Sequence, residues 1–396
     1  ACGIRGFNLT MPNKNKIVEL LDELSPAARL IGAVNTVVND DGHLTGYNTD
    51  GVGYMQAVKD AGYDITGKTI TIMGAGGAAT AICAQAALDG VEKIHIFARE
   101  TSRFWDRTQK LAENINSTLP CKAVLHENKD TAALAQAISE SALLLNATSV
   151  GMAPNTEGTI IEDTSLYHPD LIVSDVIYNP RRTALLLQAE ARSIPCSDGL
   201  PMLVAQAVAA EERFFNRSIP AGENERILVQ LRREMTNLIL IGMPGSGKTT
   251  VGEALSRLTG REAVDLDQMI ETTAGCSIPE IFQREGESGF RARERAAAEE
   301  AGKRTGVILL TGGGIIKTAE NYAALHQNGR IYQLVRDLSL LPTEGRPLSQ
   351  GADLAAMWRE RAPLYARFRD VEIDNSGTVE DTAAAIWRDF CAHSGS

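Results

Sequence analysis

Residues 237–249 have the sequence Asn-Leu-Ile-Leu-Ile-Gly-Met-Pro-Gly-Ser-Gly-Lys-Thr, in which an apolar run passes directly into a glycine-rich loop. The loop fits the pattern G-x-x-x-x-G-K-[ST] in full, and a helical stretch follows at residues 250–259. In such loops backbone N–H groups hold phosphates, the lysine reaches the β- and γ-phosphates, and the final hydroxyl group binds Mg²⁺. The stretch therefore predicts a strand, a loop and a helix that bind ATP and Mg²⁺. The predicted nucleotide contacts are Gly242, Gly245, Ser246, Gly247, Lys248, Thr249 and Thr250, with Thr249 also a metal ligand.

A second glycine-rich loop, Gly-Ala-Gly-Gly-Ala-Ala, lies at residues 74–79, after the apolar run 69–73 and before a helical stretch at 80–89. It departs from G-x-G-x-x-G because Ala79 takes the third glycine's place, where close helix packing tolerates alanine. Such a turn lets the backbone approach a pyrophosphate, so we predict a dinucleotide site. A tight turn without a nucleotide is the alternative interpretation. The predicted contacts are Gly74, Gly76, Gly77 and Ala78.

Further strand candidates follow each loop and alternate with helical patterns. They lie at residues 93–97, 142–145 and 171–176 after the first loop, and at 307–311 and 330–335 after the second. This alternation predicts an α/β chain with a Rossmann-like dinucleotide-binding domain followed by a P-loop NTPase-like domain with a parallel sheet. An amphipathic helix at 224–234 precedes the second domain, so we place the boundary between residues 235 and 236.

Composition excludes several classes of protein. The 396 residues carry 39 Lys plus Arg against 50 Asp plus Glu, and this acidic balance argues against general nucleic-acid binding. The hydrophobic content of 44% excludes a mostly disordered chain. No apolar run approaches the roughly 20 residues that span a bilayer. The six cysteines form no C-x-x-C pair, so we expect reduced thiols, no zinc site and a cytoplasmic protein with small-molecule ligands.

The strand at 93–97 is followed by Ala98-Arg99-Glu100, where a dinucleotide-binding fold contacts the adenosine ribose. The Arg99 guanidinium favours the 2′-phosphate of NADP(H), whereas Glu100 leaves NAD(H) open. A solvent-exposed arginine without a ligand is the other interpretation.

Three short polar clusters lie upstream of the first loop, and by composition alone each is a surface turn. They are Asn8-Leu-Thr-Met-Pro-Asn-Lys14, Gly32-Ala-Val-Asn-Thr36 and Gly46-Tyr-Asn-Thr-Asp-Gly51. Together with the runs at 146–152, 175–180 and 198–206, in this order and spacing, they make residues 3 to about 235 resemble the shikimate dehydrogenase family, including its quinate/shikimate branch.

This resemblance implies a catalytic pair, Lys14 and Asp50, because ketone reduction needs a proton donor beside the reacting oxygen. It also implies substrate contacts from Asn35, Asp50 and Gln206, with Tyr178 nearby. Residues 1–55 would form a partial substrate subdomain, 56–215 the NAD(P)-binding domain and 216–235 a C-terminal helix. Family members open with two further strands and a Ser-x-Ser turn that binds the substrate carboxylate. Since residue 1 lies after that region, we expect the chain as given to be a poor dehydrogenase.

Several motifs after residue 236 have ordinary interpretations when taken singly, as turns or charged faces. They are Asp265-Leu-Asp267, Phe290-Arg291, Thr311-Gly312-Gly313-Gly314, Gly345-Arg346-Pro-Leu348 and Arg361-Ala-Pro-Leu-Tyr365. As an ordered set they resemble the shikimate kinase family over residues 236 to about 392.

That resemblance implies that Asp265 supports Mg²⁺ and that Asp267 orients the attacking hydroxyl group. Arg291 and Arg361 would hold the substrate carboxylate, and the three glycines would face the ring. Arg346 would reach the phosphates from a mobile lid. The segment departs from the family because residues 338–344 contain no arginine.

The two resemblances together predict a bifunctional enzyme. Its first half would reduce 3-dehydroshikimate to shikimate with NAD(P)H, and its second half would phosphorylate the 3-hydroxyl group of shikimate with ATP. One alternative is that the first half oxidises quinate or shikimate; another is that it is a non-catalytic binding module beside an active kinase. A P-loop regulator that hydrolyses ATP is disfavoured, because it would not need two substrate-facing arginines.

Overall fold

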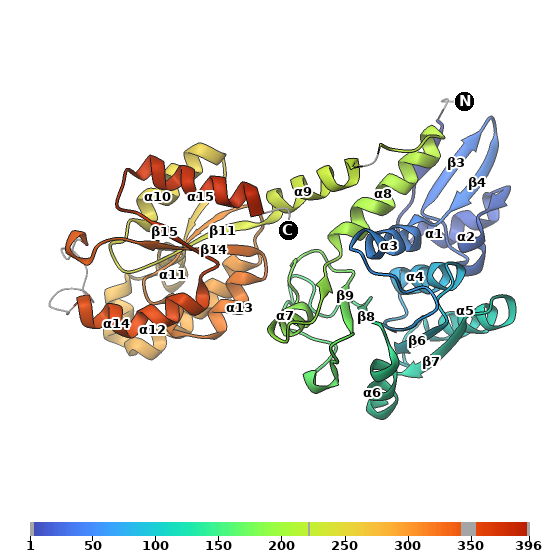
Figure 1. Ribbon diagram of the computed structural model, residues 1–396, viewed down its shortest axis with the longest axis horizontal. Coiled ribbons are helices and arrows are strands. Elements are labelled where there is room, and N and C mark those ends of the chain that lie inside the picture. The colour runs from blue at the N-terminus through green and yellow to red at the C-terminus, as the bar shows by residue number, and fades with distance from the viewer. Residues whose placement is uncertain (1–3, 221, 342–353, 394–396) are drawn as a thin grey trace. The chain divides into compact units, whose positions relative to one another are not determined.

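The computed structural model describes residues 4–220, 222–341 and 354–393, which form two compact units (Figure 1). The first unit comprises residues 1–228 and the second residues 229–396. The division falls inside helix α9 (Glu223–Met235), whereas the sequence places the boundary at the end of that helix.

The first unit begins with a four-stranded sheet of order β1-β3-β4-β2. Strands β1, β3 and β4 pair antiparallel, and β2 pairs in parallel with β4. The strands are β1 (Gly6–Asn8), β2 (Glu23–Leu24), β3 (Thr36–Asp40) and β4 (His43–Tyr47). The helices beside them are α1 (Asn13–Lys16), α2 (Pro26–Ile31) and the 3₁₀ helix η1 (Ile17–Leu20).

A six-stranded parallel sheet of order β10-β9-β8-β5-β6-β7 follows. Its strands are β5 (Thr69–Met73), β6 (Lys93–Ala98), β7 (Lys122–Glu127), β8 (Leu143–Asn146), β9 (Ile172–Asp175) and β10 (Cys196–Ser197). Its helices are α3 (Thr49–Asp60), α4 (Gly77–Leu88), α5 (Trp105–Thr118), α6 (Thr131–Glu140), α7 (Ala184–Ala191), α8 (Leu200–Phe215) and η2 (Thr164–Leu166). Chain order reverses at β5, with β6 on one side and β8 on the other. Dinucleotides bind at the carboxyl ends of strands at such a reversal.

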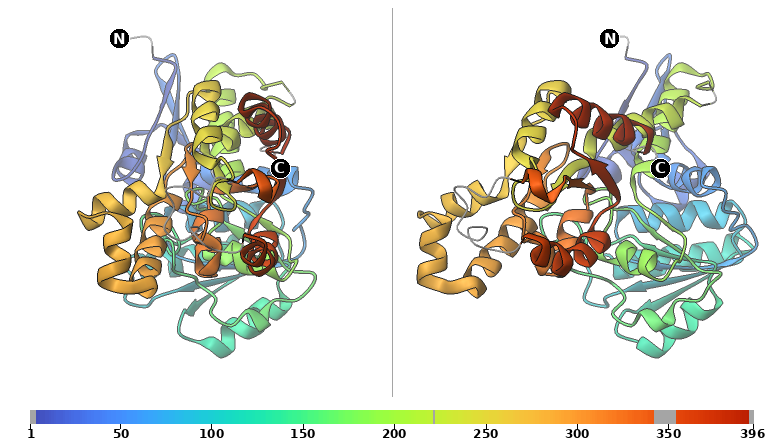
Figure 2. Two further views of the ribbon diagram at one scale, coloured as in Figure 1. Left: turned by 90° about the vertical axis from the view of Figure 1, so that its left-hand side faces the viewer. Right: turned by 60° about the vertical axis from the view of Figure 1, so that its left-hand side comes forward.

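The second unit has a five-stranded parallel sheet of order β12-β13-β11-β14-β15. Its strands are β11 (Asn237–Ile241), β12 (Ala263–Asp265), β13 (Ile308–Leu310), β14 (Gly329–Val335) and β15 (Val371–Asp374). Its helices are α10 (Lys248–Thr259), α11 (Leu266–Ala274), α12 (Ile278–Gly302), α13 (Glu320–His326), α14 (Leu354–Phe368), α15 (Val379–His393), η3 (Ile315–Lys317) and η4 (Leu338–Leu340). Both units are therefore α/β as predicted, and the views in Figure 2 show helices layered around the strands.

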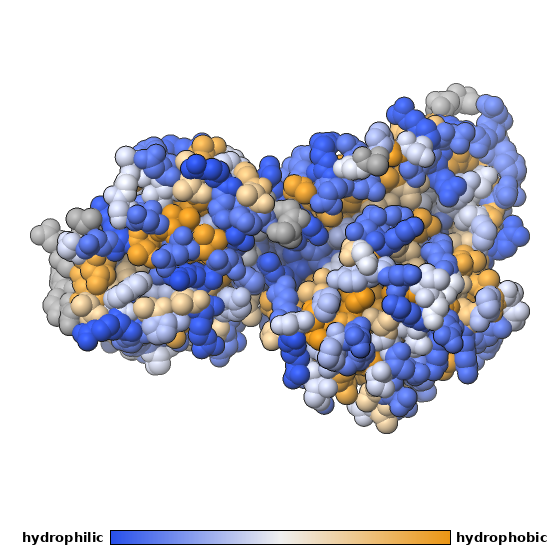
Figure 3. All heavy atoms as spheres, in the orientation of Figure 1, coloured by the Kyte–Doolittle hydropathy of each residue, from blue (hydrophilic) through white to orange (hydrophobic). Residues whose placement is uncertain are grey.

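Burial explains which strands the sequence predicts well. Every residue of β11 is buried, and so are four of the five in β5, because helices cover both faces of a parallel sheet. Strands β7 and β15 lie at sheet edges, and their polar residues hide them from a search for apolar runs. On the face that Figure 3 shows, hydrophilic side chains predominate and apolar ones are scattered among them. Within the described ranges, no helix is both long enough and apolar enough to cross a membrane.

Candidate functional sites

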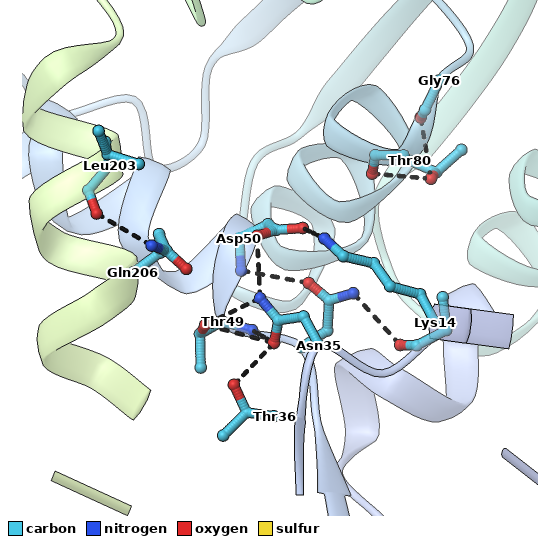
Figure 4. A network of polar contacts seen from close by, with 12 residues as sticks. Lys14, Asn35, Thr36, Thr49, Asp50, Gly76, Thr80, Leu203 and Gln206 are labelled. Carbon is cyan, nitrogen blue, oxygen red and sulfur yellow. Dashed lines mark hydrogen bonds and ion pairs between the residues drawn. The ribbon is translucent and has the colours of Figure 1, made fainter. Parts of the chain in front are cut away.

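Lys14 and Asp50 come together in the first unit although they are far apart in sequence. Lys14 Nζ lies 2.7 Å from Asp50 Oδ2, and each side chain is only about a fifth exposed (Figure 4). Lys14 belongs to α1, and Asp50 to the first turn of α3. Asn48 caps α3, its side chain accepting a hydrogen bond from the Asp50 N–H group at 3.2 Å. This cap by Asn48 fixes the position of Asp50 at the start of the helix.

Asn35 is buried at the end of the loop between α2 and β3, and its side chain is fully engaged. Its amide group donates to Asp50 Oδ1 at 2.9 Å and to Thr49 Oγ1 at 3.0 Å. Its carbonyl oxygen accepts from the Thr49 N–H group at 2.9 Å. Both oxygens of Asp50 are therefore held, one by Lys14 and one by Asn35. The structure thus gives Asn35 a role in orienting Asp50. The substrate contact that the family resemblance implies for Asn35 stays a prediction.

Gln206 extends from α8 toward the side of Thr49 and Asp50 (Figure 4). Helix α8 packs closely on α3 because Gly53 of α3 has no side chain. A Cβ atom on Gly53 would lie 2.5 Å from the backbone nitrogen of Gln206. Tyr178 follows β9 and is 42% exposed. Their substrate contacts stay predictions.

The predicted dinucleotide loop occupies the switch point of the six-stranded sheet. Gly74 has φ 126°, and a Cβ atom there would lie 2.6 Å from the Ala147 carbonyl oxygen, so only glycine fits. Gly76 precedes α4 without a side-chain cap, which leaves the first backbone N–H groups of the helix available to an anion. Gly77 and Ala78 are the first two residues of that helix.

A cavity of about 940 Å³ opens beside this loop, and Arg99 lines it. The contact of Arg99 with a cofactor stays a prediction. Gly74 and Gly76 also line the cavity. Arg103 lines the same cavity, with its guanidinium 4.7 Å from the centre of the Phe104 ring. Sequence reasoning missed Arg103, although a second arginine four residues after Arg99 could have indicated it.

Asp175 joins the two loops that follow β8 and β9. Its carboxylate accepts hydrogen bonds from Asn146 Nδ2, from Thr183 Oγ1 at 2.8 Å and from the Ile177 N–H group at 2.9 Å. Asn146 in turn donates to the Val150 carbonyl oxygen at 3.1 Å. Burial raises the pKa of Asp175 to about 6. The carboxylate thus fixes the backbone around the cofactor end of the sheet.

The second loop has the conformation that phosphate binding requires. Gly242, Gly245 and Gly247 all have positive φ angles, which favour glycine. Asn375 Nδ2 donates to the Ser246 carbonyl oxygen at 2.7 Å and fixes the far side of the loop. Lys248 Nζ donates to the Gly242 carbonyl oxygen at 2.9 Å.

A cavity of about 750 Å³ gathers most of the predicted kinase residues. Those that line it are Gly245, Gly247, Lys248, Thr249, Thr250, Asp265, Asp267, Arg291, Gly312, Gly313, Gly314 and Arg361. Gly242 and Ser246 belong to the same loop, whereas Arg346 lies outside the described residues. Residues from five separate stretches of sequence therefore share one cavity.

Two carboxylates of this cavity have different surroundings. Asp265 caps α11, and its Oδ1 atom accepts from the Asp267 N–H group at 2.9 Å. Burial and the neighbouring Asp265 charge raise the pKa of Asp267. The Thr249 hydroxyl group and the Asp265 carboxylate supply hard oxygen atoms beside the phosphate loop, so this donor set fits Mg²⁺.

Two arginines converge on the glycine turn at 312–314. Arg361 Nη1 donates to the Gly313 carbonyl oxygen at 3.1 Å, and a Cβ atom on Gly314 would lie 2.5 Å from Arg291 Nη1. The Nε atoms of both arginines are buried without a hydrogen-bond partner among the residues that the structure describes. Such unsatisfied donors suit an anionic ligand such as a carboxylate.

Glu294 is a residue of this site that the sequence analysis did not assign. Its side chain is 1% exposed and accepts from Arg291 Nη1 at 2.6 Å, while burial raises the pKa of Glu294. The contact orients the Arg291 guanidinium from behind. The spacing of three residues on one helix is a signal for such a pair, but it does not reveal the burial.

Comparisons with known proteins agree with this geometry. The family model described as shikimate dehydrogenase substrate binding domain matches residues 1–37, and the shikimate kinase model matches residues 244–390. The shikimate dehydrogenase (NADP(+)) of Listeria monocytogenes serotype 4b (strain F2365) is 50% identical over 228 residues, which cover 58% of this chain and 78% of the relative. The quinate/shikimate dehydrogenase of Escherichia coli O139:H28 (strain E24377A / ETEC) is 44% identical over 220 residues, covering 56% and 76%.

Among solved structures, shikimate 5-dehydrogenase from Listeria monocytogenes in complex with shikimate and NAD matches with a TM-score of 0.55 and 50% identity. The match covers 57% of this chain and 77% of that one. The chain therefore belongs to the shikimate dehydrogenase family and carries a shikimate kinase domain in its second unit.

Proposed function

We propose that the chain is a bifunctional shikimate-pathway enzyme. Its first unit interconverts 3-dehydroshikimate and shikimate with NADP(H), and its second unit phosphorylates shikimate at the 3-hydroxyl group with ATP. The observation that carries the proposal is the convergence of Lys248, Asp267, Arg291 and Arg361 on one cavity, in a chain that also pairs Lys14 with Asp50.

In the first unit, residues of the chain donate the proton and orient the donor. Bound NADP(H), held at the Gly74 loop and Arg99, supplies or accepts the hydride. The Lys14 ammonium group donates a proton to the carbonyl oxygen that becomes the hydroxyl group. Asp50, 2.7 Å away, orients that ammonium group, and Asn35 fixes the other oxygen of Asp50. Gln206 and Tyr178 contact the substrate from α8 and from the loop after β9.

In the second unit, the chain positions two reactants. Arg291 and Arg361 bind the shikimate carboxylate, and Gly312, Gly313 and Gly314 let the ring lie against the backbone. Asp267 accepts a hydrogen bond from the attacking hydroxyl group and orients it. Lys248 and the loop N–H groups hold the phosphates of ATP. Mg²⁺, supported by Thr249 and Asp265, neutralises phosphate charge when bound.

The experiment is a crossed assay of both activities on single variants. Because the chain as given is expected to be a poor dehydrogenase, the first assay measures the NADP⁺ reduction that it retains with shikimate. Lys14→Met should lower this retained rate by about a hundred- to ten-thousandfold, or to the detection limit, and leave shikimate phosphorylation unchanged. Lys248→Ala should abolish phosphorylation and leave NADP⁺ reduction unchanged. Lys16→Met is the matched control, because Lys16 is an exposed lysine on the same short helix as Lys14.

Equal loss of both activities in either variant would contradict two independent sites. Loss in Lys16→Met comparable to that in Lys14→Met would refute the proton-donor role. Replacing shikimate by quinate in the first assay decides between the two substrates, and the name of the Escherichia coli relative makes quinate the second candidate.

A further inference from the structure

Arg336 is a cationic residue that neither family resemblance assigned. It is the first residue after strand β14 and is partly buried. It lines two cavities: the one of about 750 Å³ that contains Lys248 and Thr249, and a second of about 480 Å³. The second is bounded in part by Ser246 and Asp374. Arg336 therefore lies between the cavity that contains Lys248 and the second cavity, which Ser246 of the phosphate loop also lines.

Sheet register explains this placement. Strand β14 pairs in parallel with β11, and Gln333 is the partner of Ile241, the last residue before the phosphate loop. A Cβ atom on Gly242 would lie 2.7 Å from the Leu334 carbonyl oxygen, so the two strand ends are in close contact. Arg336 leaves the sheet two residues later, beside the loop. The parallel register thus places Arg336 beside the phosphate loop.

The donors of Arg336 are incompletely used. Its Nε atom is buried and has no hydrogen-bond partner within the described ranges. The carboxylates that line the second cavity with it are engaged elsewhere: Asp337 accepts from the Ser339 N–H and hydroxyl groups, and Asp374 accepts from those of Ser376. A buried guanidinium N–H group without a partner costs free energy, which a bound anion would recover.

Ser246 supplies an independent observation at the same place. Its side chain is 1% exposed, and its Oγ atom is also buried without a partner among the described residues. Ser246 belongs to the phosphate loop and lines the second cavity together with Arg336. Two unsatisfied polar groups therefore border the same loop, and both can donate to oxygen atoms.

We propose that Arg336 binds the phosphate chain of the nucleotide in the kinase unit. Its guanidinium donates charge-assisted hydrogen bonds to phosphate oxygens from the side of β14, in the cavity that Lys248 also lines. Arg336 directly follows β14, so the strand fixes the position of its backbone beside the phosphate loop. This inference rests on the proposed kinase activity for its ligand.

The test measures direct binding of MgATP, MgADP and adenosine to the full chain by calorimetry. Arg336→Ala should weaken MgATP and MgADP roughly ten- to a hundredfold and leave adenosine affinity unchanged. Arg336→Lys keeps the charge but loses the planar fork, so its loss should be intermediate. Arg304→Ala is the control, because Arg304 is an exposed arginine of the same unit that pairs with Glu262 at the surface. Thermal unfolding of each variant checks that the unit is folded.

Wild-type MgATP affinity in a folded Arg336→Ala variant would overturn the inference, and so would an equal loss for adenosine. A loss of shikimate affinity with unchanged MgATP binding would also overturn it, by assigning Arg336 to the other substrate. If the wild-type chain binds MgATP but does not phosphorylate shikimate, the proposed function falls while the binding comparison still decides the role of Arg336. A chain that binds no MgATP would overturn both.

Discussion

The buried carboxylate of Asp175 should make the stability of the first unit depend on pH in a specific way. Asp175 is 1% exposed, and burial raises its pKa from an ordinary value of 3.8 to about 6 despite its three hydrogen-bond donors. The experiment changes the pH and compares the free energy of unfolding of the wild-type protein with that of the Asp175→Asn variant. The amide of the variant has similar size but does not titrate.

The direction of the pH dependence follows from the protonation state of Asp175 that the folded protein favours. Folding favours the protonated carboxyl group, so its contribution to stability is complete below pH 3.8 and is lost as the pH rises through about 6. At 1.36 kcal/mol per pH unit the whole effect is about 3 kcal/mol. Between pH 5 and pH 8 the lost part is about 1.4 kcal/mol. The unfolding free energy of the wild type, minus that of Asp175→Asn, should fall by this amount.

The assay is urea unfolding followed by tryptophan fluorescence at several pH values. Trp105 is the tryptophan of the first unit, so both proteins carry Trp358→Phe and Trp387→Phe, which leaves Trp105 as the reporter. The subtraction removes groups that titrate equally in both proteins. A difference that stays constant from pH 5 to pH 8, or that rises, would refute the assignment of a raised pKa to Asp175.

Three further predictions concern ligands. Arg99→Ala should weaken NADP⁺ roughly ten- to a hundredfold and NAD⁺ much less in fluorescence titrations, because only NADP⁺ has the 2′-phosphate; equal effects would make Arg99 a surface residue. Asp267→Asn should remove shikimate phosphorylation while calorimetry shows nearly unchanged MgATP affinity; a collapse of that affinity would assign Asp267 to the metal. Gly314→Ala places a methyl group 2.5 Å from Arg291 Nη1, so steady-state kinetics should show a raised KM for shikimate and an unchanged KM for ATP. A raised KM for ATP instead would contradict the position of the carboxylate site.

The sequence by itself determined the fold class, the two phosphate-binding loops and the interior strands of both parallel sheets. These features are local: positive φ angles demand glycine at Gly242 and Gly247, and buried parallel strands must be apolar throughout. The edge strands β7 and β15 were not predicted from the sequence, because one side of an edge strand can remain polar. Many of the residues that line the kinase cavity were also predicted, although by resemblance to a family, whereas Glu294 and Arg336 were not.

Only the tertiary structure decided how side chains are paired and buried. It brought Lys14 to Asp50 and committed the Asn35 amide to that carboxylate. It also buried Glu294 behind Arg291 and left the Arg336 Nε atom without a partner among the described residues. The physical reason is that desolvation and hydrogen bonding depend on groups distant in sequence, whereas backbone conformation and the apolar character of a strand depend on neighbouring residues.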